Sequence, residues 1–348
     1  MTKRHKVLIV PLPSARLPDP QSVPSLRWGI LGAGWIADVF ASTVLANTNQ
    51  RISAVASLTP GKAQAFAQSH GVGHFDVSYS DLANRDDIDA IYVANQPSDH
   101  RSSALLAIQA GKHVLIEKPL THSVAEASDI LASARRAGLL SMEAMWTRYL
   151  PQSDIARQLV ETGAIGSPRL IVSDFCQDNS KMERMWRKGH GGPMWDMGIY
   201  PFALCQMFLG EPSSIDAHGI LCDNKMDAQT TAYLSYHDGA RATFTVSGIA
   251  DAPHHAFIAG EKGVIEFGQP FVFPSSVGFA GKGFNSPMQV WMDESPIRGH
   301  AALAYQVTAF ADYVSRGLLE SPLQSHDDTL ACLRTAAEIL RCVGADAP

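Results

Sequence analysis

The chain has 348 residues and a mass of 37.5 kDa, and at roughly 150 residues per domain this length favours two domains. Hydrophobic residues make up 46% and charged residues 18%, which excludes a disordered or collagen-like chain. The net charge of −6 argues against general affinity for nucleic acid or anionic membranes. No apolar stretch reaches the roughly 18 residues of a membrane span. The five cysteines form no C-x-x-C pair, so a reduced, cytoplasmic compartment fits best.

The first 25 residues form a proline-rich segment that contains Pro11, Pro13, Pro18, Pro20 and Pro24. Its basic start imitates a signal peptide, but the apolar run covers only residues 7–10. A signal peptide needs an apolar run of roughly 7–15 residues. We therefore interpret residues 1–25 as an extended arm packed on the body.

From Leu26 onward, continuous apolar runs alternate with helix-like segments. The predicted strands are residues 26–31, 52–57, 89–95, 113–118 and 139–144, and the predicted helices are residues 35–46, 62–69, 99–110 and 123–137. The last helix opens with a capping box formed by Ser123 and Glu126 and closes at Gly138. Apolar strands between helices are typical of parallel β-α units that are covered on both faces. Residues 26–145 are therefore predicted to form a doubly wound α/β, or Rossmann, domain.

After a predicted helix at residues 152–162, strands follow one another directly. The predicted hairpins pair residues 230–236 with 240–247, and residues 256–259 with 264–267. Two final helices, at about residues 301–316 and 327–342, are expected to cover one face of this sheet. Residues 146–348 are thus predicted to form an α+β domain with an open, mainly antiparallel sheet, separated from the first domain by a cleft.

The first predicted strand runs into Gly32-Ala33-Gly34-Trp35-Ile36-Ala37. Gly32 permits a tight turn, and Gly34 lets a pyrophosphate approach the backbone. The free N–H groups and the positive end of the following helix would bind the diphosphate. Because this motif lies between a strand and a helix, dinucleotide binding is favoured over a merely tight turn.

The end of the second strand indicates which dinucleotide is bound. NAD enzymes usually carry Asp or Glu there, which accepts a hydrogen bond from the ribose 2′-hydroxyl. This chain has Ser57, followed by Thr59 and Lys62, so two hydroxyls and one ammonium could bind a 2′-phosphate. NADP is therefore favoured over NAD. The alternative is that Lys62 is simply a solvated helix residue, and the arginine often found beside the serine in NADP enzymes is missing.

The segment Glu117-Lys118-Pro119 ends the strand at residues 113–118. The carboxyl ends of strands line the ligand crevice of such sheets, so Lys118 is a candidate to face the ligand. Pro119 restricts the backbone of Lys118 and removes one ladder donor. From position alone, a solvated surface lysine is an equally good interpretation.

The second half contains Gly-Gly-Pro-Met-Trp-Asp-Met-Gly-Ile-Tyr-Pro at residues 191–201. Asp196 and Tyr200 would share one face of a helix. Both interrupt apolar sequence, which indicates a buried carboxylate and a buried phenol. The alternative is that Asp196 caps a helix and Tyr200 is a core aromatic residue.

The histidines predict no metal site. Glycines between His70 and His74 disfavour a helical pair, and His254-His255 has no carboxylate or cysteine at ligand spacing. His100 could cap or line the nucleotide cleft, and a satisfied structural histidine is an equally good interpretation.

Together these motifs resemble the glucose–fructose oxidoreductase and inositol dehydrogenase superfamily over residues 26–341. The resemblance is carried by GAGWIA, AGKHVLIEKP and the Asp-x-Gly segment. Within it, EAMWTRYLP, DFC, DMGIYP and ESPLQSHDDTL are most similar to the branch of dihydrodiol dehydrogenase and NADP-dependent D-xylose dehydrogenase. Two features depart from the pattern: the segment between Trp186 and Asp196 is short, and Asn95-Gln96-Pro97 replaces the usual Thr-Pro-Asn.

The resemblance implies that Lys118 and Tyr200 are the catalytic pair, with Asp196 orienting the lysine or the hydroxyl. The expected substrate-binding residues are Lys118, Trp146, Phe175, Asp196 and Tyr200. The expected coenzyme-binding residues are Gly32, Gly34, Trp35, Ile36, Ser57, Lys62, Asn95, His100, Glu117 and Lys118.

The resemblance also implies an NADP-dependent dehydrogenase that oxidises a cyclic polyol, such as an aldopyranose like D-xylose or a trans-dihydrodiol. The Lys118 ammonium would lower the pKa of Tyr200 from its unperturbed value of about 10. Lys118 taking the proton directly is the other assignment. The alternative functions are a sugar oxidoreductase with tightly bound cofactor and a catalytically silent NADP-binding regulator. A homodimer or homotetramer through the open sheet is also expected.

Overall fold

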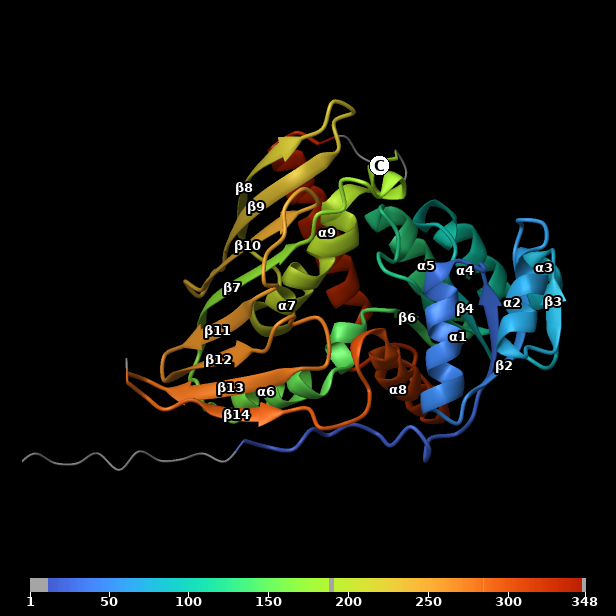
Figure 1. Cartoon of the computed structure of the whole chain (residues 1–348), viewed down its shortest axis with the longest axis horizontal. Coiled ribbons are helices and arrows are strands. Elements are labelled where there is room, and N and C mark those ends of the chain that lie inside the picture. Colours follow the sequence, from blue (N-terminus) through green and yellow to red (C-terminus); the bar gives the residue numbers. More distant parts are fainter. Residues whose placement is uncertain (1–11, 188–190, 284, 346–348) are drawn as a thin grey trace, which may run out of the picture.

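The computed structural model describes residues 12–187, 191–283 and 285–345, and it contains two sheets with helices between and around them (Figure 1). Residues 1–11 of the expected arm lie outside the described residues. Residues 13–19 are extended and lie against α6 (Pro151–Glu161). There the Arg16 backbone N–H donates to Asp154 Oδ2 at 2.7 Å, and the Arg16 guanidinium pairs with Asp154 Oδ1 at 3.0 Å. Burial alone would raise the pKa of the Asp154 carboxyl, but the hydrogen bonds from Arg16, the charge of Arg157 and the hydrogen bond from Gln158 together lower it.

The first sheet is parallel and doubly wound, as the sequence predicted. Its strands, in the spatial order β3-β2-β1-β4-β5-β6, are β1 (Arg27–Leu31), β2 (Arg51–Ala56), β3 (His74–Asp76), β4 (Ala90–Val93), β5 (His113–Ile116) and β6 (Ser141–Glu143). Its helices are α1 (Trp35–Asn47), α2 (Lys62–His70), α3 (Tyr79–Ala83), α4 (His100–Gln109) and α5 (Val124–Ala137). The strand order reverses between β1 and β4, which is where such sheets bind ligands.

Two of these strands end two residues earlier than predicted. β4 ends at Val93 and β5 ends at Ile116, so Asn95 and Lys118 stand in the loops that follow. Both loops lie at the carboxyl edge of the sheet, beside the β1–α1 turn. The short elements β3 and α3 were not predicted from the sequence.

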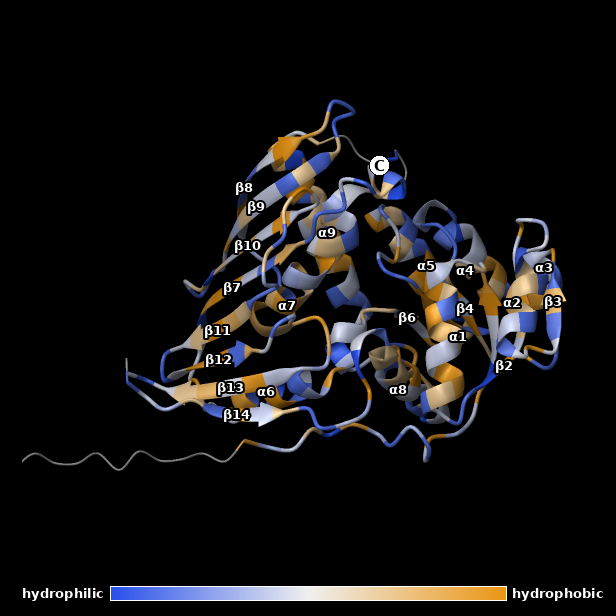
Figure 2. Cartoon of the chain, viewed as in Figure 1, coloured by the Kyte–Doolittle hydropathy of each residue, from blue (hydrophilic) through white to orange (hydrophobic). Residues whose placement is uncertain are grey.

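The second sheet is mixed but mainly antiparallel, which confirms the predicted fold class. Its strands are β7 (Pro168–Cys176), β8 (Ser214–Leu221), β9 (Asp227–Ser235), β10 (Arg241–Ser247), β11 (Ala256–Gly260), β12 (Gly263–Phe267), β13 (Ser276–Gly281) and β14 (Gln289–Met292). Their spatial order is β14-β13-β12-β11-β7-β10-β9-β8, and the pair of β7 with β10 is parallel. Strands β7, β8, β13 and β14 were not predicted. Hydrophobic residues run along the strands of both sheets, whereas the connecting loops are largely hydrophilic (Figure 2).

Helices cover one face of the second sheet. They are α6, α7 (Ile199–Leu209) and α9 (His326–Val343), and they lie between the two sheets (Figure 1). α9 packs on β8 and β9, as predicted. Met194–Gly198 forms a π-helical turn immediately before α7, and this segment carries part of the site described below.

The prediction that both final helices cover the second sheet is wrong for α8 (Leu303–Ser315), which packs on α1 instead. Phe310 of α8 is fully buried, and its ring lies 4.9 Å from that of Trp28 in β1. Trp28 also contacts Phe40 of α1, which stacks on Tyr92 of β4 at 3.9 Å. Because α1 alone leaves this large aromatic cluster incompletely covered, the chain returns to the first sheet and α8 completes its core.

Candidate active site

The turn between β1 and α1 has room for a diphosphate. Gly32 has φ = 103°, and a Cβ there would lie 2.8 Å from the Ala94 carbonyl oxygen, so glycine is required in this turn. A Cβ on Gly34 would meet no atom of the described residues within 4 Å, so the backbone faces open space. No side chain of the described residues caps α1 at Gly34. The first N–H groups of this helix are therefore suited to bind an anion.

The side chains that follow this turn differ in exposure. Trp35 is 60% exposed at the start of α1, whereas Ile36 is half-buried and packs against the core of the first domain. A bound dinucleotide would lie over this turn, so Gly32, Gly34, Trp35 and Ile36 all remain candidates to contact it.

His100 holds together the two loops that follow β4 and β5. It is fully buried, and its ring nitrogens lie 3.1–3.2 Å from the carbonyl oxygens of Pro119, Leu120 and Asn95. Burial lowers the pKa of this imidazole. These contacts fit the second interpretation, a satisfied structural histidine: His100 positions the segments that carry Asn95 and Lys118. The Asn95 side chain donates to Ser103 Oγ at 2.7 Å, at the mouth of the same crevice.

The loop after β2 has both a positively charged and a negatively charged side chain close to it. Ser57 is 5% exposed, and its Oγ accepts a hydrogen bond from the Thr59 N–H at 3.2 Å. Lys62 is exposed at the start of α2, whose first turn contains no acidic residue. Asp76 at the end of β3 was missed by the sequence reasoning, which considered only the end of the second strand. Its carbonyl oxygen accepts from the Ser57 N–H at 3.2 Å, which brings a carboxylate close to this loop.

Glu117 is buried directly behind the lysine of the Glu-Lys-Pro segment. Its Oε1 accepts from the Tyr92 hydroxyl at 2.5 Å, and its Oε2 accepts from the Lys118 N–H at 3.1 Å. Burial raises the pKa of the Glu117 carboxyl, although the Tyr92 hydrogen bond and the Lys118 charge act in the opposite direction. Glu117 is only 8% exposed, so it supports the backbone of Lys118 from inside the sheet.

Lys118 and Asp196, which belong to different halves of the chain, form an ion pair. Lys118 Nζ donates to Asp196 Oδ1 at 2.7 Å and to the Asp196 carbonyl oxygen at 2.6 Å. Burial alone would lower the pKa of Lys118, but the Asp196 carboxylate, together with Tyr200 and Glu117, outweighs this effect and the net pKa is raised. Lys118 therefore stays protonated, and the alternative of a solvated surface lysine is excluded. Arg184 Nη2 lies 4.0 Å from the other oxygen, Asp196 Oδ2.

Tyr200 lies beside this ion pair, in the first turn of α7. Lys118 Nζ is 5.1 Å from the centre of its ring. The π-helical turn carries Asp196 and α7 carries Tyr200, and the structure brings both to Lys118. The resemblance implied this grouping, whereas the spacing alone predicted only that Asp196 and Tyr200 share a helix face. Burial raises the pKa of the Tyr200 phenol, the Lys118 ammonium lowers it, and the carboxylates of Glu117 and Asp196 raise it further. The net shift is upward.

Aromatic residues flank Tyr200 on two sides. The Trp146 ring centre lies 6.5 Å from that of Tyr200, and the Phe175 ring centre lies 5.6 Å from it. Trp146 belongs to the 3₁₀ turn Trp146–Tyr149 and Phe175 to β7, so the structure brings together the residues expected at a substrate pocket. His300 was missed by the sequence reasoning because no motif surrounds it. It stacks on Trp146, with ring centres 5.3 Å apart.

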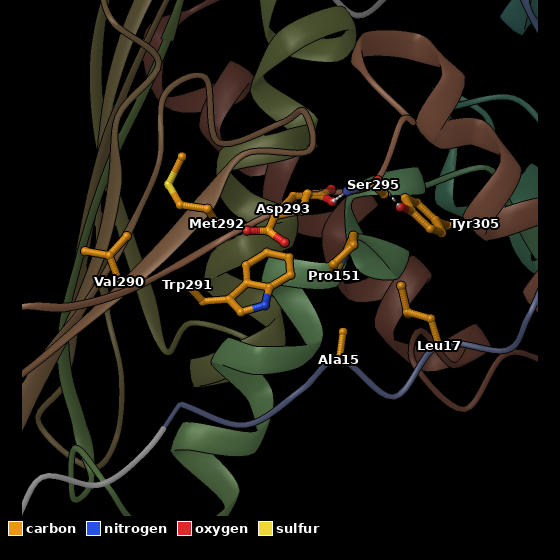
Figure 3. A pocket seen from close by; sticks show the side chains of 10 residues that line it. Ala15, Leu17, Pro151, Val290, Trp291, Met292, Asp293, Ser295 and Tyr305 are labelled. Atoms are coloured by element: carbon orange, nitrogen blue, oxygen red, sulfur yellow. Dashed lines mark hydrogen bonds between the residues drawn. The ribbon is translucent and has the colours of Figure 1, made fainter.

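A separate surface pocket of about 600 Å³ lies between the arm, α6, α8 and β14 (Figure 3). Ala15 and Leu17 of the arm, Pro151 and Trp291 line it, and the hydroxyls of Ser295 and Tyr305 meet at its edge, 3.1 Å apart. None of the expected site residues lines this pocket. We therefore locate the candidate active site at the side chains clustered around Lys118, at the carboxyl edge of the first sheet, and not here.

The described part of the chain shows neither a metal cluster nor a membrane-spanning helix. No group of three or more His, Cys, Asp or Glu residues there is arranged to hold a metal ion. In the same residues, no helix is long and apolar enough to cross a membrane. The five cysteines are all described and unpaired, and the cytoplasmic location stays a prediction.

Comparison with known proteins identifies relatives of both halves of the chain. Residues 26–144 match the model of an oxidoreductase family with an NAD-binding Rossmann fold, and residues 154–266 match a GFO/IDH/MocA C-terminal domain. The chain is 31% identical over 327 residues to trans-1,2-dihydrobenzene-1,2-diol dehydrogenase of Xenopus tropicalis. This match covers 92% of the chain and 99% of the Xenopus protein.

Solved structures show the same fold at lower sequence identity. A levoglucosan dehydrogenase in complex with NADH and levoglucosan has a TM-score of 0.82 at 18% identity, covering 93% of this chain and 100% of that chain. An aldose-aldose oxidoreductase from Caulobacter crescentus, complexed with glycerol, has a TM-score of 0.80 at 23% identity, covering 92% and 98%. At these identities the likeness establishes the shared fold.

The segment that carries Asp196 is anchored by a buried carboxylate, Asp227 of β9. Asp227 is 1% exposed, and its Oδ2 accepts from the Met194 N–H at 2.9 Å, at the start of the π-helical turn. A Cβ on Gly192 would lie 2.6 Å from Asp227 Oδ1, so the preceding backbone is also tightly fitted. Burial raises the pKa of Asp227 from 3.8 to about 7.

This shift predicts a specific dependence of stability on pH. Between about pH 4 and about pH 7 the folded protein keeps a proton on Asp227 that the unfolded chain has lost, so stability falls as pH rises. We expect Asp227→Asn, which is neutral at every pH, to be more stable relative to the wild type at about pH 8 than at about pH 5. Thermal melts of both proteins across this range measure the difference. A difference that does not change with pH would contradict the assignment.

Proposed function

Because the chain belongs to the GFO/IDH/MocA oxidoreductase family, as its motifs predicted, we propose that its substrate is a cyclic polyol and its coenzyme is NADP. The protein is an NAD(P)-dependent dehydrogenase that acts on alcohol groups. The proposed substrate is an aldopyranose such as D-xylose, or a trans-dihydrodiol. The observation that carries the proposal is the Lys118–Asp196 ion pair next to Tyr200, at the carboxyl edge of the Rossmann sheet.

A cyclic substrate fits the surroundings of Tyr200. Trp146 and Phe175 offer apolar faces on which a ring could pack, and the polar groups concentrate at Lys118, Asp196 and Tyr200. Dihydrodiol dehydrogenases are among the relatives, and the levoglucosan dehydrogenase structure holds a sugar-derived ring. A few convergent polar groups in an aromatic wall orient a ligand with several hydroxyls.

In the proposed mechanism, Tyr200 exchanges the proton of the reacting hydroxyl. Lys118 donates two hydrogen bonds to Asp196, and an ammonium has three N–H groups, so one can point to the substrate oxygen or the phenol. Because its pKa is raised, Lys118 remains a cation and stabilises a Tyr200 phenolate instead of taking the proton itself. Bound nicotinamide would supply the acceptor for the hydride that leaves the carbon carrying the reacting hydroxyl.

Gly32, Gly34, Trp35 and Ile36 would hold the diphosphate side of the coenzyme, with Asn95 at the mouth of the crevice. The open space at Gly34 and the uncapped start of α1 support this placement. Glu117 would act indirectly, by fixing the backbone of Lys118.

The catalytic pair is tested after a screen of NADP reduction with pentoses, hexoses, inositols and diols has identified the best substrate. We expect Tyr200→Phe to lower kcat by roughly 10²–10⁴ while NADP binding persists. Lys118→Met should cost a comparable factor and shift the rising limb of the oxidation pH profile to higher pH, because the ammonium lowers the pKa of Tyr200. Near-normal turnover by Tyr200→Phe would disprove its role, and no turnover with any polyol would favour a silent binding protein.

The preference for NADP is proposed from the loop after β2. Lys62 and the uncapped start of α2 offer positive charge to a 2′-phosphate, and no acidic side chain stands in that first turn. A carboxylate at position 57 would repel the phosphate and accept from the 2′-hydroxyl of NAD.

We expect Ser57→Asp to move the NADP/NAD ratio of kcat/KM toward NAD by about tenfold or more. Lys62→Ala should lower kcat/KM selectively for NADP, and by a smaller factor than Ser57→Asp, because the effect of an exposed cation is partly screened by salt. Asp76→Asn serves as a control with the opposite expected effect. It removes a negative charge close to the loop after β2 and should move the ratio of kcat/KM toward NADP. The measurement is kcat/KM for both coenzymes at one ionic strength, and a wild type that prefers NAD would refute the proposal.

We also propose a homodimer or homotetramer that forms through the open face of the second sheet. The strand register traces one row of neighbours across this face: Asp216, Tyr233, Thr243, Val172, Phe257, Glu266, Gly278 and Val290. Tyr233 is 47% and Val290 55% exposed at its two sides, and apolar Val172 and Phe257 lie in its middle. Exposed apolar surface of this kind marks interaction sites.

Light scattering during gel filtration tests this oligomer. We expect the wild type to elute as a dimer or tetramer and Val172→Asp to shift it to monomers, because a charge would be buried without a partner. A wild type that is monomeric at micromolar concentration would contradict the proposal.

A further inference from the structure

His300 connects the coenzyme turn to the aromatic wall around Tyr200. It lies in the 3₁₀ turn Gly299–Ala302, immediately before α8. Its ring is nearly parallel to that of Trp146, at 7° with centres 5.3 Å apart. Its edge contacts Trp35 at 5.1 Å and 88°, and Phe273 at 5.0 Å and 73°. Three rings from three different segments therefore hold this imidazole in one orientation.

The imidazole is neutral and keeps its hydrogen-bonding capacity. Burial lowers the pKa of His300, and the nearby Lys118 ammonium lowers it further. None of the described residues hydrogen-bonds either ring nitrogen, although the ring is half-buried. A neutral imidazole carries one N–H donor and one acceptor nitrogen. His300 is thus a polar group with free donor and acceptor positions in a wall that is otherwise formed by Trp146 and Phe273.

We infer that His300 is a substrate-binding residue whose imidazole hydrogen-bonds a polyol hydroxyl other than the one that is oxidised. The inference rests on the proposed function, because it requires a substrate with several hydroxyls. A ring hydroxyl pressed against Trp146 or Phe273 would lose its hydrogen bonds to water, at a cost in binding. A fixed donor and acceptor at that point removes this cost for one orientation of the ring and so selects it.

His300 is set beside the proton-transferring groups, although the charge of Lys118 acts on it. Its contacts are to Trp146, Trp35 and Phe273, whereas the Lys118 ion pair and Tyr200 form the reacting cluster. A change at His300 should therefore affect how the substrate is held more than how fast its proton moves. This separates its expected kinetic signature from that of Tyr200.

The test compares His300→Phe with His300→Gln. The phenylalanine keeps an aromatic ring for stacking but has no nitrogen, whereas the glutamine keeps a donor and an acceptor without the ring. With the best polyol from the screen, we expect His300→Phe to raise KM by roughly tenfold with a smaller change in kcat. His300→Gln should stay within about threefold of the wild type. The Kd of NADP, measured by calorimetry without polyol, should be unchanged in both.

A series of polyol analogues that each lack one hydroxyl identifies the bond itself. The penalty of His300→Phe should disappear for one analogue and persist for the others, because that analogue has already lost the bonded hydroxyl. An equal penalty on every analogue, or a raised Kd for NADP with an unchanged KM for polyol, would overturn the inference. The first outcome would assign His300 to packing and the second to the coenzyme side.

Controls keep these outcomes separable. Thermal melts establish that each variant is folded, and His300→Met, which fills space without a hydrogen-bonding nitrogen, replaces His300→Phe if that variant is unstable. His300→Met should raise the KM of the polyol by the same factor as His300→Phe. If the screen finds a polyol substrate but neither His300→Phe nor His300→Met raises its KM, the inference about His300 fails and the proposed function stands. If no polyol is turned over, the proposed function fails and the inference with it.

Discussion

The candidate active site depends on the ammonium group of Lys118, which stays charged although the side chain is largely buried. The Lys118 side chain is 14% exposed, and a charge so far from water is costly unless it is paired and hydrogen-bonded. Asp196 supplies both a carboxylate oxygen and a carbonyl oxygen, at 2.7 and 2.6 Å. Because Lys118 follows β5 and Asp196 precedes α7, the same contact joins the two halves of the chain. Removing either partner would leave a buried charge and also loosen this junction.

The rest of the site is arranged around that contact by buried residues. His100 ties the loop after β4 to the segment after Lys118, Glu117 accepts from the Lys118 backbone, and Asp227 holds the start of the π-helical turn. Each satisfies backbone groups that no regular helix or strand satisfies there. A π-helical turn is itself rare and is frequently found at functional sites. The geometry of Asp196 is thus fixed by partners at distant positions in the sequence.

Local patterns in the sequence were sufficient to predict the doubly wound sheet and the Gly32 turn, and they marked Lys118, Asp196 and Tyr200 as candidates whose roles came from the resemblance to the family. Each of these has a signal within a few residues, such as an apolar run, a glycine pair or a polar residue in apolar sequence. The docking of α8 on Trp28 has no such signal, because an amphipathic helix does not specify which sheet it covers. His300 and Asp76 also lack a local pattern, because residues distant in the sequence bring them to the site. Asp76 reaches it through the pairing of β3 with β2, and His300 through the aromatic rings that surround it. β14 was missed because a short edge strand with exposed side chains resembles a loop.

The charges around Tyr200 determine which protonation state the resting site favours. Burial and the carboxylates of Glu117 and Asp196 raise the pKa of the phenol, and the single Lys118 cation offsets only part of this rise. Lys118 itself is held in its protonated form by the same carboxylates. At neutral pH the resting site therefore contains a phenol, the form that gives a proton to a carbonyl oxygen during reduction. Oxidation of an alcohol needs the phenolate, so the same arrangement favours oxidation at higher pH and reduction at lower pH. The balance between the two directions is thus set by how strongly one ammonium acts against two carboxylates.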